Sequence, residues 1–248
     1  MAGQATGHAA VIELWQRVID AQPAPPPGLV LAVGLLAAVL VGWRRSWRVL
    51  RGVVTIAHEG GHAAVAALTG RRLLGVRLHS DTSGLTVSVG RPTGPGMVFT
   101  LVAGYLAPSA LGLFGALLLM SGRITALLWI AVGLLGAMLL LIRNVYGVIS
   151  VVSTGAVLVV LSWFTQPAVQ GAFAYLLVWF LLIAGPRPVL ETSRLRRRGR
   201  AADSDPDQLA RLTGVSASLW IALFGVLTVL AAAVGALSLL PWVALLAT

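Results

Sequence analysis

Seven apolar runs, most of them long enough to cross a lipid bilayer, dominate this chain. They cover residues 28–43, 52–69, 97–120, 124–142, 145–164, 170–186 and 215–239. A spanning helix needs about 20 apolar residues, within a range of roughly 17 to 25. The first run is short and the second is only moderately apolar. We therefore expect an all-α polytopic membrane protein with six or seven transmembrane helices, located in the cell membrane.

The overall composition agrees with lipid as the main solvent. Hydrophobic residues make up 58% and charged residues 10% of the 248 residues, which is more apolar surface than a soluble chain of this length can bury. All 18 basic residues are arginine and the net charge is +10. No interleaving of basic and aromatic residues accompanies this charge, so we expect contacts with lipid head groups and no nucleic-acid partner. The absence of cysteine excludes disulfides, thiolate metal ligands and a cysteine nucleophile.

The chain divides into three parts. Residues 1–27 form an N-terminal tail, either with an amphipathic surface helix or only partly ordered, residues 28–239 form the transmembrane domain, and residues 240–248 form a C-terminal tail. Within the transmembrane domain, residues 187–214 are rich in arginine and then in acidic residues, which predicts an aqueous loop. Its segment SDPDQLARLTG predicts a helix start with Ser204 as N-cap.

A β-hairpin insert is predicted between the second and third apolar runs, at residues 72–90. Here the apolar period changes from helical to alternating, with Leu74, Val76 and Leu78 on one face of a first strand and Leu85, Val87 and Val89 on one face of a second. SDTSG, residues 80–84, has the composition of a turn. An edge of this hairpin either stays open to pair with an extended peptide or is covered by the protein itself.

The arginines do not select one membrane topology. Strict alternation of the spans places the cluster of Arg44, Arg45, Arg48 and Arg51 on the opposite side from residues 187–200. A re-entrant segment at 52–69 would place both clusters on one side and leave only Arg123 across the membrane. Both topologies stay open, and so does the orientation of the protein.

The run at 52–69 carries ionisable side chains where a membrane helix normally has none. Within GVVTIAHEGGHAAVAALTG, His58 and His62 are four positions apart, so both imidazoles leave one face of a helix. This spacing lets two ring nitrogens bind one zinc ion, with Glu59 beside them to move a proton. Ionisable groups at membrane depth are costly and are usually functional. The motif therefore predicts a zinc site inside the transmembrane domain.

Around this motif the chain resembles the site-2 protease family of intramembrane zinc metallopeptidases, in its bacterial B-type branch. The resemblance runs from about Val53 to about Leu230. It rests on AHEGGHAAVAALTGRR, LHSDTSGLTVSVG, LVAGYLAPSALG, RNVYGVISVVSTG and SDPDQLARLTG, in that order. The first segment is specific, and the others count chiefly through their order.

The resemblance implies cleavage of a transmembrane or membrane-proximal segment of a protein or peptide substrate within the lipid bilayer. His58 and His62 would hold Zn²⁺, and Glu59 would be the catalytic base that takes a proton from the zinc-bound water and passes it to the leaving amine. The hairpin would present the substrate as an added strand, and AGYLAP would pack near the active site. The alternative is a catalytically inactive relative that binds membrane segments and regulates or escorts them.

One part of the family pattern is missing from the chain. Site-2 proteases take their third zinc ligand from an aspartate in a Leu-Asp-Gly motif, on a helix that also carries an Asn-x-x-Pro signature. Here Asn144 begins a similar stretch, with Gly147 at the place of the proline and Val152 at the place of the aspartate. The third ligand must therefore come from elsewhere or be absent.

Four residues are candidates for this third ligand. Asp205 is the first choice, because it precedes the last span in a segment that the B-type branch shares, although capping a helix start would also explain it. Asp81 fits a turn, and Glu191 lies in the arginine-rich segment. Asn144 would be a weak ligand and is instead predicted to bind the substrate backbone or a broken helix end. Without any of these, two histidines and water would hold the metal.

Overall fold

The computed structural model describes residue 16, residues 18–200 and residues 203–240. Its helices are α2 (Pro27–Gly42), α3 (Arg44–Leu68), α4 (Pro95–Met120), α5 (Ile124–Leu141), α6 (Val145–Phe164), α7 (Pro167–Ala184), α8 (Pro186–Arg197), α9 (Asp205–Thr213) and α10 (Ala217–Leu239), and its strands are β1 (Arg72–Leu78) and β2 (Gly84–Val89). Most of the expected amphipathic helix of the N-terminal tail and nearly all of the C-terminal tail lie outside the described residues.

The helices confirm a multi-pass integral membrane protein. Five of those described are long and apolar enough to cross a bilayer, namely α4, α5, α6, α7 continued by α8, and α10. Helices α2 and α3 meet at an angle of 99° and pass the same test only as a pair, which is the pattern of a broken span or of a re-entrant segment. The run at 52–69 does not pass this test by itself; it is part of α3, which also carries the arginine cluster. The described residues thus hold five spans, or six if this pair is one span.

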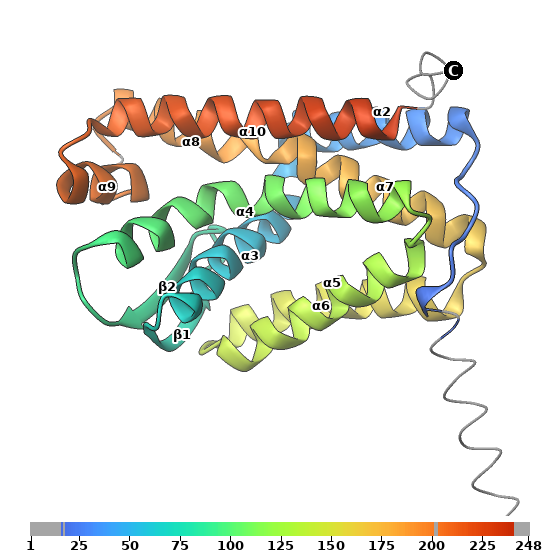
Figure 1. Cartoon of the computed structure of the whole chain (residues 1–248), viewed down its shortest axis with the longest axis horizontal. Helices are drawn as coiled ribbons and strands as arrows, with labels where there is room; N and C mark the ends of the chain where they lie inside the picture. Colours follow the sequence, from blue (N-terminus) through green and yellow to red (C-terminus); the bar gives the residue numbers. More distant parts are fainter. Residues whose placement is uncertain (1–15, 17, 201–202, 241–248) are drawn as a thin grey trace, which may run out of the picture.

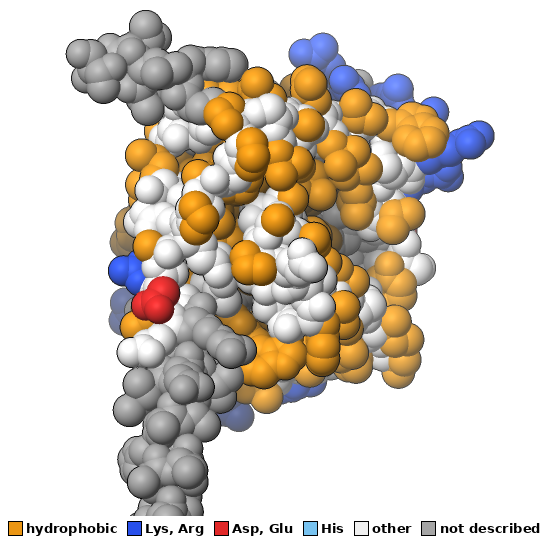
Figure 2. All heavy atoms as spheres, turned by 90° about the vertical axis from the view of Figure 1, so that its right-hand side faces the viewer, with side chains coloured by type: hydrophobic (Ala, Val, Ile, Leu, Met, Phe, Trp, Pro, Cys, Tyr) orange, Lys and Arg blue, Asp and Glu red, His pale blue; other side chains and the backbone are white. Residues whose placement is uncertain are grey.

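Helix α4 lies at the centre of the packing, with α3, α7 and α10 against it, while α2 packs on α7 and α5 on α6 (Figure 1). Most of the core is one apolar cluster from α2, α4, α5 and α7. Large exposed apolar side chains line α5, α6 and α10, as expected for surfaces that face lipid chains. Figure 2 views the right-hand end of the molecule in Figure 1, where apolar side chains predominate and basic side chains lie at the edges.

The predicted hairpin is present, with one difference in its first strand. β1 and β2 pair antiparallel, and a bulge between Leu73 and Gly75 inserts one residue. The bulge reverses the alternation on its N-terminal side, so Leu74 is 46% exposed whereas Val76 is fully buried. The expectation that Leu74 shares a face with Val76 is therefore wrong.

The outer edge of β1 is covered by the break between α5 and α6. Val76 forms a parallel bridge with Ile142, and the backbone N–H of Arg143 donates to the carbonyl of Val76. The Asn144 amide then accepts from the N–H of Leu78 (3.1 Å) and donates to its carbonyl (2.7 Å). Of the two hairpin edges, that of β1 is therefore closed by the chain itself.

Residues 187–214, expected as an aqueous loop, fold mostly into two helices, which corrects that expectation. Helix α8 follows directly on α7 and begins at Pro186. Proline is tolerated in the first turn of a helix, because an N–H there would have no partner within the helix. Helix α9 begins after Ser204, as the sequence predicts, and ends at Gly214 in the left-handed conformation. The Ser204 hydroxyl donates to the Asp207 carboxylate (2.6 Å) instead of capping a backbone N–H.

The two arginine-rich segments lie on the same side of the molecule. The Glu191 carboxylate of α8 accepts from the Trp47 indole N–H (2.7 Å) and pairs with Arg51 (3.6 Å), both on α3. The guanidinium of Arg187 lies 4.3 Å from the centre of the Trp47 ring. The start of α3 and helix α8 are thus neighbours.

Candidate metal centre

The site is built where α3 packs closely against α4. The absence of a side chain at Gly61 makes this approach possible, because a Cβ there would lie 2.5 Å from the Ala107 Cβ and 2.7 Å from the Ala103 carbonyl oxygen. One turn of α3 places His58 and His62 on the α4 side, where His62 is 7% exposed. Gly104 of α4 lies under both rings, since a Cβ there would lie 2.4 Å from the His62 Nε2 and 2.8 Å from the His58 Cε1.

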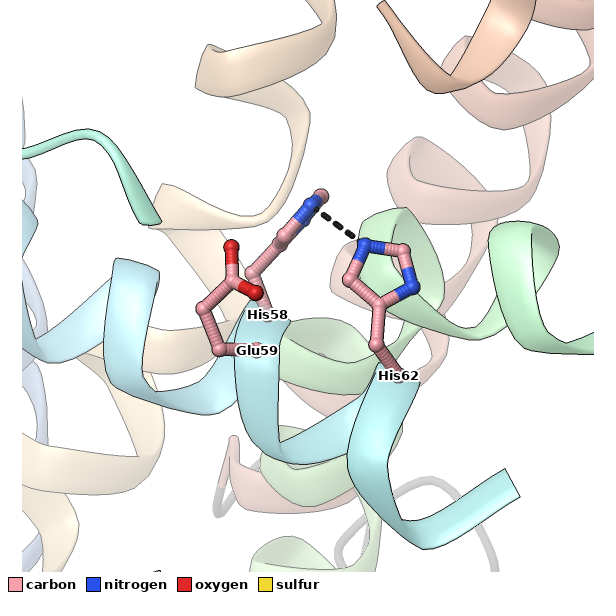
Figure 3. Close-up of side chains that lie close together, drawn as sticks. All are labelled: His58, Glu59 and His62. Atoms are coloured by element: carbon pink, nitrogen blue, oxygen red, sulfur yellow. Dashed lines mark hydrogen bonds between the residues drawn. The ribbon is translucent and has the colours of Figure 1, made fainter. Parts of the chain in front are cut away.

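The two imidazoles direct their Nε2 atoms at a common point (Figure 3). These atoms are 3.0 Å apart, and the two rings are nearly perpendicular. The Nδ1 of His62 lies 2.7 Å from the carbonyl oxygen of Thr100. Because a carbonyl can only accept, Nδ1 carries a proton, which leaves Nε2 as the ring nitrogen that would bind a metal. This is the tautomer that binds a metal through Nε2, with the other ring nitrogen oriented by a backbone carbonyl.

Asp205 completes the cluster from the start of α9. Its Oδ2 lies 3.2 Å from the His58 Nε2 and 3.3 Å from the His62 Nε2. Burial opposes ionisation of this carboxyl, but hydrogen bonds with His58 and His62 hold its pKa well below its usual range. Asp205 is therefore a carboxylate at neutral pH, one that faces two ring nitrogens.

Helix α9 is held in place by an apolar contact and by ion pairs. Leu209 is fully buried in a cluster with Leu101, Tyr105 and Phe224 of α4 and α10. At the other side of α9, Asp207 pairs with Arg196 of α8. Burial would raise the pKa of Asp207, but hydrogen bonds with Ser204 and Arg196 lower it below its ordinary value. These contacts fix the position of the neighbouring Asp205.

The three atoms that face one another have the spacing and chemistry of a zinc site. Their separations of 3.0, 3.2 and 3.3 Å are close to the edge of about 3.3 Å expected for a tetrahedron of ligands around zinc. Two imidazole nitrogens and one carboxylate oxygen are ordinary zinc ligands. With only lone pairs facing each other, they would repel unless a proton or a cation lay among them. The donor set therefore fits zinc.

Glu59 lies beside this cluster and is 4% exposed. Its carboxylate, with one nitrogen from each histidine, belongs to a group of ligand atoms within 4.8 Å of one another. Figure 3 shows the carboxylate next to the His58 ring. The Oε2 of Glu59 accepts a 2.6 Å hydrogen bond from the hydroxyl of Thr86 on β2. A buried carboxylate next to a metal-ligand set can serve as a proton acceptor.

The other candidate residues lie away from the histidines. The Asp81 carboxylate accepts from the Ser83 N–H and hydroxyl in the exposed hairpin turn, and these bonds lower its pKa. Glu191 is engaged with the aromatic and basic side chains of α3 and α8. The Asn144 amide is engaged with the backbone of β1. Among the four candidates, Asp205 is the one that contacts both histidines.

Several residues of the site had no local sequence signal. Thr86 is one polar position in an alternating strand, and Thr100 contributes only its backbone carbonyl. Gly104 lies within AGYLAP, so the family resemblance was a signal for its segment although not for its role. Val152, at the place of the usual aspartate, is 48% exposed. Helix α6 therefore offers no ligand at that position.

The fold and the site define a polytopic membrane protein with a buried His-Glu-His group on a helix packed inside the bundle. A family model described as Peptidase M50B-like matches residues 31–235. This match covers most of the chain, and the protein belongs to that peptidase family, in agreement with the resemblance to site-2 proteases. No curated protein and no solved structure matches the chain.

Proposed function

We propose that the protein is a zinc-dependent intramembrane endopeptidase that hydrolyses peptide bonds in membrane-embedded or membrane-proximal segments of protein or peptide substrates. Its zinc ligands are His58, His62 and Asp205, and its general base is Glu59. The observation that carries the proposal is the convergence of the three ligand atoms at separations of 3.0 to 3.3 Å. Family membership supports the class of reaction.

The residues of the chain divide the work of hydrolysis between them. When bound, zinc would polarise the scissile carbonyl and acidify the attacking water. Thr100 would keep His62 in the ligating tautomer through its carbonyl. Glu59 would accept a proton from the attacking water and deliver it to the leaving amine, so that it ends the reaction ionised, as it began. Burial of Glu59 and His62 would limit bulk water at the site.

Zinc stoichiometry of the purified protein tests the ligand set. The wild type should hold about one zinc per chain, and both His62→Ala and Asp205→Ala should lose it. Asp207→Ala is the matched control, because Asp207 lies on the same short helix but pairs with Arg196 instead of the histidines. Full zinc retention in Asp205→Ala would overturn its assignment as a ligand and would direct attention to Asp81, Glu191 and Asn144.

The Glu59→Gln variant separates a peptidase from an inactive relative. It should keep zinc and lose hydrolysis of a membrane-spanning peptide added in the same micelles. The second test is complementation of a strain that lacks the gene. If the wild type and Glu59→Gln restore its phenotype equally, then the protein acts by binding membrane segments and not by cleaving them. Substrate binding at Asn144 stays a prediction, to be tested by the effect of Asn144→Ala on KM.

A further inference from the structure

The carboxylate of the proposed base is held by the hairpin and not by its own helix. The Thr86 hydroxyl approaches the Glu59 Oε2 at 2.6 Å and also lies 3.2 Å from the Glu59 backbone carbonyl. Glu59 is 4% exposed, and Thr86 is the one side chain in the described part of the chain that hydrogen-bonds its carboxylate. A hydroxyl at this distance from a carboxylate is a charge-assisted donor, of the stronger kind of protein hydrogen bond.

Gly84 makes room for the other half of the same carboxylate. Gly84 and Thr86 are two positions apart on β2 and therefore share the face turned to α3. A Cβ on Gly84 would lie 2.4 Å from the Glu59 Oε1 and 2.5 Å from its Cγ. The clash would involve only the end of a flexible side chain, so an added methyl group would displace the carboxylate without forcing the backbone apart.

The position of β2 is itself fixed by the surrounding chain. The Asn144 amide holds both backbone polar groups of Leu78, which pairs with Gly84 across the hairpin. On α3, the Thr55 hydroxyl donates to the Thr82 carbonyl in the hairpin turn (2.8 Å). The hairpin is therefore attached to α6 and α3 independently of the contact with Glu59, and Thr86 reaches Glu59 from a defined register.

We propose that Thr86 is a positioning residue for Glu59, and that Gly84 keeps free the space in which the carboxylate lies. The Thr86 hydroxyl occupies Oε2 and fixes the plane of the carboxylate, which leaves Oε1 to accept the proton of the attacking water. The hairpin thus completes the catalytic site besides any contact that it makes with substrate. This inference rests on the proposed function.

The test compares four variants of the full-length, zinc-loaded protein. Thr86→Val removes the hydroxyl at nearly constant volume, Thr86→Ser keeps it, and Gly84→Ala fills the space of Glu59. Thr55→Val is the matched control, because it removes another hydroxyl that joins α3 to the hairpin without touching Glu59. Zinc content and melting temperature are measured for each, so that a variant that has lost its fold is recognised.

Two readouts report the position of Glu59. The first is the affinity for acetohydroxamate, which chelates zinc and shares its proton with a neighbouring carboxylate, so it needs no substrate. The second is kcat and KM for a quenched fluorogenic membrane-spanning peptide in the same micelles. Loss of one charge-assisted hydrogen bond predicts a decrease of about ten- to a hundredfold in kcat for Thr86→Val, with zinc content and KM unchanged. Hydroxamate affinity should fall with kcat.

The pattern across the variants decides the inference. Loss in Thr86→Val and Gly84→Ala, with Thr86→Ser and Thr55→Val near wild type, would support it. Wild-type hydroxamate affinity and kcat in zinc-loaded Thr86→Val would overturn it and leave the proposed function intact. An equal loss of kcat and hydroxamate affinity in Thr55→Val would also overturn it. The effect would then come from the placement of the hairpin and not from the hydrogen bond between the Thr86 hydroxyl and Glu59. A wild type without zinc would overturn the proposed function and this inference together.

Discussion

Replacing Gly104 by alanine should abolish zinc binding without unfolding the protein. The added Cβ would lie 2.4 Å from both the Cε1 and the Nε2 of His62 and 2.8 Å from the Cε1 of His58. An ordinary contact between such atoms is about 3.5 Å, so the His62 ring would have to retreat by about 1 Å. Zinc–ligand distances tolerate deviations of only about 0.2 Å. We therefore expect zinc affinity to fall by at least about a hundredfold.

The packing around Gly104 leaves no easy way to absorb this clash. If α4 moved away from α3, the Thr100 carbonyl would leave the His62 Nδ1, which it contacts at 2.7 Å. Meanwhile alanine favours a helix over glycine by about 1 kcal/mol, and the clash involves only side chains of the site. The melting temperature of the metal-free protein should therefore change by less than about 4 °C.

Competition with a chromophoric chelator gives the zinc affinity, and calorimetry of the metal-free protein gives the melting temperature. Gly133→Ala on α5 is the matched control, because a Cβ there would meet nothing within 4 Å. It should keep wild-type zinc affinity. Wild-type zinc affinity in Gly104→Ala would refute the argument, since the imidazoles could not then occupy the position from which they were inferred to bind the metal.

Three further predictions concern the docking of α9, the response to pH and the topology. Leu209→Ala removes a fully buried side chain, which should weaken the docking of α9 by about 2–5 kcal/mol and lower zinc affinity in equilibrium dialysis although Asp205 is unchanged. Acidification from pH 7 to 5 should release zinc, because metal ligands must be deprotonated and protons compete with the metal for them. Helix α9 should nevertheless stay docked and resist proteolysis at pH 5. Folding lowers the pKa of Asp207, so its contribution to stability is complete above the ordinary pKa of 3.8. It is lost only as the pH falls through the lower pKa of the folded state. The chain has no cysteine. With α2 and α3 as one span, Asp20→Cys before α2 and Arg91→Cys after the hairpin should react with an impermeant maleimide from opposite sides of the membrane. Reaction of both from the same side would refute this span and indicate a re-entrant segment.

The histidine pair and the hairpin were predictable because local geometry determines them. A helix brings positions i and i+4 to one face whatever surrounds it, so the spacing of His58 and His62 was sufficient to predict that their side chains meet. Alternating apolar residues around a turn likewise predicted β1 and β2. The bulge beside Gly75 was not predicted, although a glycine inside a strand is a signal for one. Its position is visible only in the pairing with β2.

The arrangement around the histidines depended on contacts between distant parts of the chain. The helix that usually carries the third ligand offers none here, because Val152 stands at the ligand position and is exposed. Asp205 was one of four candidates in the sequence, and the docking of Leu209 against α4 and α10 selects it by bringing α9 over the histidines. The role of Thr86 depends in the same way on where the hairpin lies against α3.

The sequence alone therefore determined the solvent, the number of spans to within one and the helix with the His-Glu-His group, since each follows from composition or from the spacing of neighbouring residues. Its family followed from the resemblance of several ordered segments. Only the tertiary structure decided that α3 bends sharply away from α2, that Asp205 faces His58 and His62, and that the Glu59 carboxylate lies against Gly84 and Thr86. These features arise from close packing between segments far apart in the chain. Packing of that kind depends on the shapes of the assembled surfaces, which no local pattern of residues records.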